Sequence, residues 1–176
     1  MASEPSAISE PGHCRFISRN GNHLSRFDAL GYQLATLLDV DDAILDGEMI
    51  ATDDSGRPQF YELLRRTRGV AYVAFDLLWA DGTDLRTLPL SARRERLRSI
   101  LPTDSASVSE ALSVIGRGCQ FFELTLAHDL EGIVAKRLAD PYAPRIRWLK
   151  IKNHNYSQQE GRRELFNGLR PSRRIG

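Results

Sequence analysis

The segment Val70–Trp79 limits the possible folds of this chain more than any other part of the sequence. Its residues, VAYVAFDLLW, include several β-branched and aromatic side chains and one charged side chain, Asp76. A short apolar run of this length, followed by the turn residues Asp81-Gly82, is typical of a buried strand. A buried strand needs neighbouring strands and a covering layer, so the rest of the chain must provide both.

The remaining sequence offers such elements at intervals. Residues 14–19 alternate between apolar and polar as in a half-buried strand, and leucines recur at helical spacing within 27–38. Ser91 is expected to be the N-cap of a helix that Pro102 ends. Further strands are expected over 43–51, 132–138 and 147–152, and helices over 61–68, 91–101 and 119–129. The pattern predicts an α+β fold whose strands pair across long stretches of sequence.

The two ends of the chain differ in composition from its middle. Residues 1–13 are rich in Ser, Pro and Glu without periodicity, and we expect them to be disordered. Residues 14–153 are expected to form the folded part and 154–176 a basic tail. The net charge is +1, yet residues 132–176 carry eleven basic and three acidic side chains. This basic end indicates either a polyanionic partner or a solvated tail, and charge alone does not decide.

The cysteines and histidines form no recognisable site. Cys14 and Cys119 are far apart and the four histidines are scattered, so we expect neither a zinc site nor a catalytic histidine. No apolar run reaches the roughly 18 residues that span a bilayer. The first residues also lack the apolar region of a signal peptide. These features predict a cytoplasmic protein that does not contact the membrane.

Two lysines lie close together in the last expected strand. Because side chains alternate along a strand, Trp148, Lys150 and Lys152 share one face, and Leu149 and Ile151 share the other, as in a buried strand. The two ammonium groups, about 7 Å apart, repel each other unless an anion such as phosphate lies between them. Alternatively the lysines lie in solvent on an edge strand, where charge prevents further strand pairing. This segment alone supports both interpretations equally.

Acidic residues interrupt two other apolar segments. Glu131 stands before Gly132, and a glycine at a strand entrance lets the backbone approach a ligand closely. One carboxylate combined with phosphate oxygens is a usual way to hold Mg²⁺, and Lys136 would add a positive charge. Asp46-Gly47-Glu48 places two acids in an apolar strand, which a purely structural strand has little reason to contain. Phe75 lies in an apolar strand too, where core packing is the ordinary role of its ring.

Taken together and in order, five short segments resemble the motif series of ATP-dependent DNA ligases. The resemblance is closest to bacterial stand-alone ligases and to the ligase domains of bacterial end-joining enzymes. The segments are Ser18-Arg-Asn-Gly21, Leu45-Asp-Gly-Glu48, Phe75-Asp-Leu-Leu-Trp79, Glu131-Gly-Ile-Val-Ala-Lys136 and Trp148-Leu-Lys-Ile-Lys152. Residues 152–166 resemble the stretch after the last motif, so the likeness covers about residues 14–166. It implies a nucleotidyltransferase adenylation domain of the ATP-grasp-like ligase type, with antiparallel sheets flanked by helices.

The resemblance also implies roles for the residues that would surround the nucleoside of ATP. Arg19 would contact the nucleotide and help to orient a DNA phosphate, and Glu48 would hydrogen-bond the ribose. Phe75 would stack on adenine, a use of its aromatic face beyond packing. Lys136 would be a further nucleotide contact.

The phosphates and the metal ion would be bound by residues near the end of the motif series. Glu131 would bind Mg²⁺, while Lys150 and Lys152 would hold the α-phosphate and stabilise charge during its transfer. An arginine just before the last motif usually assists in this family. Arg145 is the preferred candidate and Arg147 the alternative.

The motif that would carry the nucleophile is not found in these 176 residues. In the family, a lysine in Lys-x-Asp-Gly, one hairpin upstream of Ser-Arg-Asn-Gly, attacks the α-phosphate of ATP. The chain has three lysines, Lys136, Lys150 and Lys152, and none precedes x-Asp-Gly. The family's OB-fold is also missing after Phe166. We therefore expect a partial adenylation domain, truncated before the catalytic lysine, that binds ATP and is inactive alone because it cannot form lysyl-AMP.

Two other hypotheses fit the same residues. The chain could be an active ligase that seals nicked double-stranded DNA once a separate chain or an upstream segment supplies the lysine. It could instead be a non-catalytic DNA-binding accessory module that uses its basic end. Nicked duplex DNA is the partner that the resemblance implies, and ATP and Mg²⁺ are the cofactors.

Overall fold

The computed structural model describes residues 5–51 and 69–157. The chain divides into two compact units. Unit 1 consists of residues 1–113 and 136–147, and unit 2 consists of residues 114–135 and 148–176. The helix expected over 61–68 lies outside the described residues.

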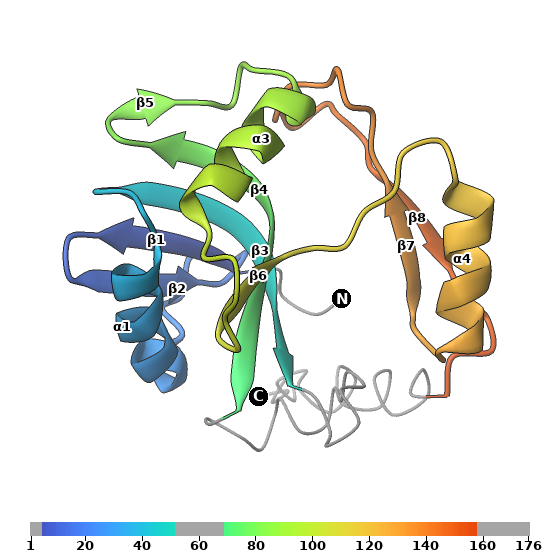
Figure 1. The fold of residues 1–176 in the computed structure, drawn as a ribbon, viewed down its shortest axis with the longest axis horizontal. Coiled ribbons are helices and arrows are strands. Elements are labelled where there is room, and N and C mark those ends of the chain that lie inside the picture. The colour runs from blue at the N-terminus through green and yellow to red at the C-terminus, as the bar shows by residue number, and fades with distance from the viewer. Residues whose placement is uncertain (1–4, 52–68, 158–176) are drawn as a thin grey trace, which may run out of the picture. The chain divides into compact units, whose positions relative to one another are not determined.

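Unit 1 contains a mixed sheet of six strands in the order β2-β1-β3-β4-β5, with β6 beside β4 (Figure 1). The strands are β1 (Ser6–Glu10), β2 (His13–Ile17), β3 (Ala43–Ala51), β4 (Val70–Ala80), β5 (Thr83–Asp84) and β6 (Val108–Glu110). All neighbours are antiparallel except β4 and β6, which pair in parallel. The expected α+β fold is confirmed, and the sheet is antiparallel apart from that one pair.

The strand β1 corrects the expectation that residues 1–13 are disordered. Residues 6–10 pair with β2 on one side and with β3 on the other, so β1 is an inner strand. The sequence hides it because the buried positions of β1 hold the small side chains of Ala7 and Ser9. Hydrogen bonding along both edges stabilises a strand whose own composition predicts none.

Unit 1 also contains two α-helices, the first after a 3-10 turn and the second after a loop. The turn η1 (Ser25–Phe27) leads into α1 (Asp28–Leu37), and α3 covers Leu90–Ile100. Gly31 lets α1 approach β2 closely, because a Cβ there would lie 2.1 Å from the carbonyl oxygen of Cys14.

The expected N-cap of α3 is wrong, because Pro89 and not Ser91 occupies that position. The N–H of Leu90 donates to the Asp140 carbonyl at 2.9 Å, and the N–H of Ser91 donates to the Leu138 carbonyl at 3.0 Å. A distant segment of the chain therefore satisfies the first N–H groups of this helix, so a side-chain cap is not needed.

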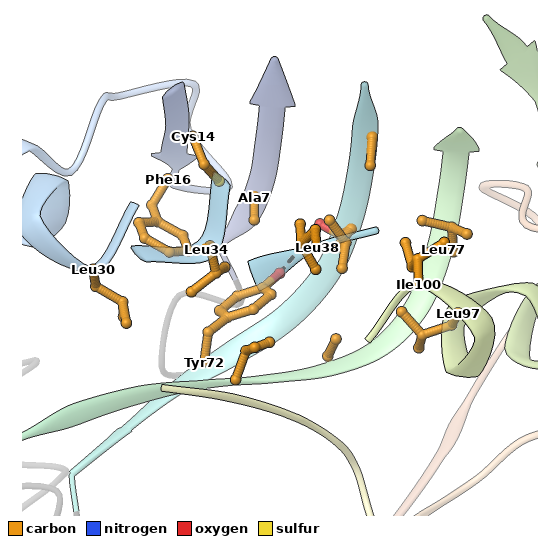
Figure 2. Close-up of a cluster of buried hydrophobic side chains, with 14 of the residues drawn as sticks. Ala7, Cys14, Phe16, Leu30, Leu34, Leu38, Tyr72, Leu77, Leu97 and Ile100 are labelled. Carbon is orange, nitrogen blue, oxygen red and sulfur yellow. Dashed lines mark hydrogen bonds between the residues drawn. The ribbon is translucent and has the colours of Figure 1, made fainter. Parts of the chain in front are cut away.

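The core of unit 1 joins residues from both helices and from five strands, namely β1, β2, β3, β4 and β6. Leu34 of α1 and Leu97 of α3 belong to the same buried cluster as Phe16, Leu45 and Leu77. Figure 2 shows Phe16 and Leu34 near the Tyr72 ring, and Leu97 and Ile100 near Leu77. Because the helices and the sheet share one buried cluster, they pack as layers around a single core.

Tyr72 brings a polar group into this core. Its hydroxyl lies 3.0 Å from the Pro5 carbonyl oxygen and 3.2 Å from that of Leu45. Burial raises the pKa of the Tyr72 phenol well above its usual value, and the nearby charge of Asp46 adds to the effect. Gly47 leaves the space for this side chain, because a Cβ there would lie 2.5 Å from the Tyr72 ring.

Unit 2 contains one helix and a two-stranded antiparallel sheet. These are α4 (Gly118–Ala127), β7 (Gly132–Ala135) and β8 (Leu149–Lys152). Both strands are shorter than the expected 132–138 and 147–152, because residues 136–147 belong to unit 1. The expectation of a buried-type strand is wrong for β8, in which Leu149 is 65% exposed and Ile151 is 41% exposed. Among the described helices, none has the length and apolar character required to cross a membrane.

Candidate functional site

Glu48 lies on the face of the unit 1 sheet that is turned away from the buried cluster. Along β3 the side chains at Leu45, Gly47 and Met49 are buried, whereas Glu48 is half-buried. Its partner across the strands is Val73, which is also half-buried. The alternation of a strand thus places the Glu48 carboxylate where water or a ligand can reach it.

Phe75 occupies an irregularity in the same pair of strands. Gly47 pairs with Ala74 and Asp46 pairs with Asp76, so the strand register passes over Phe75. Such a β-bulge redirects the side chain of the extra residue. Phe75 is half-buried and is absent from the core cluster that contains its neighbour Ala74. The ring of Phe75 therefore lies outside the buried cluster of unit 1.

Lys136 lies against the ring of Phe75. The Lys136 Nζ atom is 4.2 Å from the centre of the Phe75 ring, which is cation–π geometry. The structure thus brings together two of the residues expected to contact the nucleotide, although they are 61 positions apart. A flat aromatic face beside an ammonium group suits a ligand that combines an aromatic base with negative charge.

Arg19 lies in a tight turn after β2. Ser18 organises this turn: its N–H donates to the Asn22 carbonyl at 2.8 Å, and its carbonyl accepts from the Gly21 N–H at 2.8 Å. The Ser18 hydroxyl oxygen also accepts from the Asn22 N–H at 3.1 Å. Gly21 has a φ of +79°, a conformation that favours glycine. The turn leaves the Arg19 side chain exposed to solvent.

A buried ion pair holds residues 136–147, which carry Lys136 and Arg145, against the rest of unit 1. The guanidinium of Arg93 donates two hydrogen bonds of 2.7 Å to the Asp76 carboxylate. It also donates to the carbonyls of Leu88 and Asp140, at 2.6 and 3.1 Å. The Asp140 carbonyl belongs to residues 136–147, so this contact ties that segment to α3 and β4.

Tyr142 extends this connection to β3. Its hydroxyl donates to the carboxylate of Asp46 at 2.9 Å, and its ring lies 5.9 Å from the Arg93 guanidinium carbon. Asp46 therefore has a structural partner, which is a reason for an acid in this strand that the sequence did not reveal. Arg145 and Arg147 lie beyond this anchor and are both exposed, so the structure does not choose between them.

In unit 2, Lys150 and Lys152 lie on one face of the two-stranded sheet. Lys150 pairs with Val134, and Lys152 pairs with Gly132. Both lysines are exposed, and β8 pairs only with β7 among the described residues. The arrangement fits two cations around an anion, and it fits an edge strand equally well.

Gly132 is required where β7 begins. It has a φ of +145°, and a Cβ at this position would lie 2.1 Å from the Ile151 carbonyl oxygen. Glu131, which precedes it, is exposed, and its carbonyl accepts from the Asn153 N–H at 2.8 Å. The close approach of β8 to β7 thus depends on the glycine of this motif.

The donor set around Glu131 limits the kind of metal site that is possible. In the described residues there is no group of three or more His, Cys, Asp or Glu side chains that could hold a metal ion. A single carboxylate fits Mg²⁺ that arrives with the phosphates of a nucleotide, because Mg²⁺ usually binds one or two carboxylates together with phosphate oxygens.

The candidate residues thus fall into two groups. Those in unit 1 are Arg19, Glu48, Phe75, Lys136 and Arg145, and those in unit 2 are Glu131, Lys150 and Lys152. Every one of them is half-buried or exposed, and none belongs to the hydrophobic core. Sequence reasoning missed the residues that hold these groups in place, namely Arg93, Tyr142 and Asn153.

Comparison with protein families gives one match across most of the chain. Residues 7–152 match the family described as "ATP dependent DNA ligase domain". The LigD proteins of Mycobacterium tuberculosis are 35% identical over 149 residues, which is 82% of this chain and 19% of theirs. The SPbeta prophage-derived DNA ligase-like protein LigB of Bacillus subtilis is 33% identical over 131 residues, which is 69% of this chain and 48% of that protein.

Solved structures show the same likeness. The ligase domain of M. tuberculosis LigD superimposes with a TM-score of 0.68 at 32% identity, covering 86% of this chain and 52% of that one. A mycobacterial DNA ligase D complexed with ATP and MES gives a TM-score of 0.67 at 30% identity, covering 87% and 52%. The chain therefore spans about half of these ligase domains, and less than half of the curated relatives quoted above.

Proposed function

Because this chain belongs to the family of ATP-dependent DNA ligase domains, we propose that it binds ATP with the residues of the motif series. In unit 1, Phe75 stacks on adenine, Glu48 hydrogen-bonds the ribose, and Arg19 and Lys136 contact the nucleotide. In unit 2, Lys150 and Lys152 hold the α-phosphate. Arg145 is a further phosphate contact, with Arg147 as its alternative.

The position of Phe75 carries this proposal. A phenylalanine in an apolar strand is ordinarily a core residue. Here the ring lies at a bulge, outside the core cluster, with the Lys136 ammonium 4.2 Å from its centre. An aromatic ring at this position, beside a cation, supports a role in stacking on a base.

Mg²⁺ would be held by Glu131 together with the phosphates of ATP, and it would neutralise negative charge on the phosphate that is transferred. In the family reaction, a lysine amine forms a bond to the α-phosphorus while the bond to the pyrophosphate oxygen breaks. Lys150 and Lys152 would stabilise the charge that moves onto pyrophosphate. The whole reaction of such ligases is the sealing of nicked duplex DNA, as in repair and recombination.

We further propose that these 176 residues do not adenylate themselves. The three lysines of the chain are assigned to contacts with the nucleotide and its α-phosphate, and none stands in Lys-x-Asp-Gly. Binding groups without the attacking amine can hold ATP but cannot transfer AMP to the protein.

ATP binding by the full chain, measured by isothermal titration, tests the first proposal. Replacing Phe75 by Ala or Leu should weaken binding by about fivefold or more, since stacking of a base on an aromatic ring contributes about 1–3 kcal/mol. Tyr32→Ala is the matched control, because Tyr32 is an exposed aromatic residue on α1. Absence of saturable binding to the wild-type chain would refute the proposal.

Incubation with α-labelled ATP and Mg²⁺, followed by denaturing electrophoresis, tests the second proposal. We expect no labelled protein band, and a labelled band would show that one of the three lysines accepts AMP. Label that appears only when a polypeptide containing Lys-x-Asp-Gly is added would favour an enzyme completed by a second segment. Binding of nicked duplex DNA without ATP, with an affinity that falls linearly with log salt, would favour the accessory-module hypothesis.

A further inference from the structure

Asn153 follows the last lysine of β8 and is 5% exposed, although its side chain is polar. A buried amide needs hydrogen-bond partners, and Asn153 has them. Its side-chain N–H₂ donates to the Leu130 carbonyl at 3.1 Å, and its side-chain oxygen accepts from the Asn155 N–H at 2.9 Å. Its backbone N–H donates to the Glu131 carbonyl at 2.8 Å. All of these residues belong to unit 2.

The two carbonyls that Asn153 binds lie on either side of the Cα atom of Glu131. The Leu130 carbonyl belongs to the peptide group before Glu131, and the Glu131 carbonyl belongs to the peptide group after it. Because each peptide group is planar, holding both of them fixes φ and ψ at Glu131 and therefore the direction of its Cα–Cβ bond. Asn153 also follows Lys152 directly in the chain. Asn153 therefore links the backbone that carries the Glu131 carboxylate to the backbone that carries the Lys152 ammonium.

Neighbouring contacts prevent this segment from shifting as a whole. The Leu130 N–H donates to the Thr125 carbonyl of α4 at 2.8 Å, and the carboxylate of Asp129 accepts from the Ser157 N–H at 3.0 Å. The hydroxyl of Ser157 donates to the same carboxylate. These three bonds hold the residues that precede Glu131, but none of them reaches the two carbonyls beside its Cα atom.

We infer that Asn153 is a positioning residue that fixes Glu131 relative to Lys152, so that the carboxylate meets the metal ion carried by ATP. The inference rests on the proposed binding of ATP and Mg²⁺. Residues that orient metal ligands typically contribute about 10–100-fold to metal affinity. Asn153 is not itself a ligand of the metal or of the nucleotide, and it acts through the backbone of Glu131.

The test measures the Kd of ATP for the full chain with Mg²⁺ and with EDTA. In the wild type, Mg²⁺ should strengthen binding. Asn153→Asp keeps the size of the side chain and the acceptor for the Asn155 N–H, but it removes the donor to the Leu130 carbonyl. Asn153→Asp and Asn153→Ala should both lower the gain from Mg²⁺ by about tenfold. Their Kd in EDTA should remain within about twofold of the wild type, because adenine stacks on Phe75 in unit 1.

Asn155→Ala is the matched control. Asn155 is an exposed asparagine two residues away, and only its backbone N–H takes part in the contacts of Asn153. This variant should keep the full gain from Mg²⁺. The inference is overturned if Mg²⁺ strengthens ATP binding to Asn153→Asp as much as to the wild type. It is also overturned if Asn155→Ala loses as much of this effect of Mg²⁺ as the Asn153 variants do.

Hydrogen exchange of the same proteins separates failure of this inference from failure of the proposed function. If the wild type does not bind ATP, the proposed function fails, but the positioning role still predicts faster amide exchange across 130–135 in the Asn153 variants. Exchange in α3 should stay at the wild-type rate, which shows that unit 1 remains folded. Unchanged exchange across 130–135 in Asn153→Asp and Asn153→Ala would refute the positioning role whether or not ATP binds.

Discussion

Removing either member of the buried pair formed by Asp76 and Arg93 should destabilise unit 1 strongly, whereas removing both should cost less than the sum. The Arg93 side chain is 2% exposed and the Asp76 side chain is 0% exposed, so neither charge can turn to water. Asp76→Ala leaves the guanidinium with only two carbonyl partners. Arg93→Met leaves the carboxylate with one hydrogen-bond donor among the described residues, the Leu77 N–H at 2.9 Å. Each single change should cost about 3–5 kcal/mol, the usual effect of an unpaired buried charge.

In the double variant, Asp76→Ala with Arg93→Met, no buried charge remains. What is lost is the Asp76 acceptor of the Leu77 N–H and the Arg93 donor to the Leu88 carbonyl. The Asp140 carbonyl still accepts from a backbone N–H of α3 at 2.9 Å. A buried group left without its partner costs about 1–3 kcal/mol, so the double variant should lose roughly 2–6 kcal/mol, against a sum of roughly 6–10 for the single variants. The centres of these two ranges differ by about 4 kcal/mol, which is the expected coupling free energy.

Urea denaturation followed by tryptophan fluorescence gives these free energies, because Trp79 lies on β4 with Asp76. The exposed pair of Asp84 and Arg86 provides the control, since surface ion pairs contribute little. The equivalent double and single changes there should leave the midpoint nearly unchanged. Additive costs at Asp76 and Arg93, with a coupling below about 0.5 kcal/mol, would show that the two side chains do not act as one unit.

Three further outcomes are expected. Gly47→Ala should destabilise the chain by about 1–3 kcal/mol in urea denaturation, because the new Cβ would overlap the Tyr72 ring; an unchanged midpoint would contradict the packing described. Gly132→Ala should speed amide exchange across β7 and β8 while α3 stays protected, and equal protection in both would contradict the close approach of these strands. Iodoacetamide should label the exposed Cys119 in the native protein but not the buried Cys14. Burial raises the pKa of the Cys14 thiol to about 12 from 9.0. The buried neutral thiol therefore contributes fully to stability below pH 9, and this contribution is lost as pH rises toward 12. The urea midpoint should fall over that pH range, and it should fall less in Cys14→Ala.

Much of the fold follows from local pattern. The strands β3 and β4 match their expected ranges closely, because long apolar runs bounded by turns leave few alternatives. By contrast, β1 has Ala7 and Ser9 at its buried positions, and its stability comes from the strands on both sides. The five residues of β1 show no apolar alternation, so the sequence does not indicate that they pair with β2 and β3.

The candidate site was predicted unevenly for a similar reason. The motif residues could be proposed because their order along the chain resembles a family, and the structure adds a bulge at one of them, Phe75. The residues that support them were missed. Arg93 on a helix with four arginines looks like a solvated surface residue, and only the fold shows that it is buried. Asn153 stands in a polar stretch where asparagine ordinarily indicates a turn.

The division of the chain into two units has a practical consequence for protein engineering. The backbone passes from one unit to the other after Ser113, after Ala135 and after Arg147. Neither unit is encoded by one uninterrupted stretch of the gene, so a terminal truncation that removes one unit also deletes part of the other. Separate expression of unit 1 would require residues 114–135 to be replaced by a designed linker between Ser113 and Lys136. Fusion partners and affinity tags are therefore best attached to the whole chain.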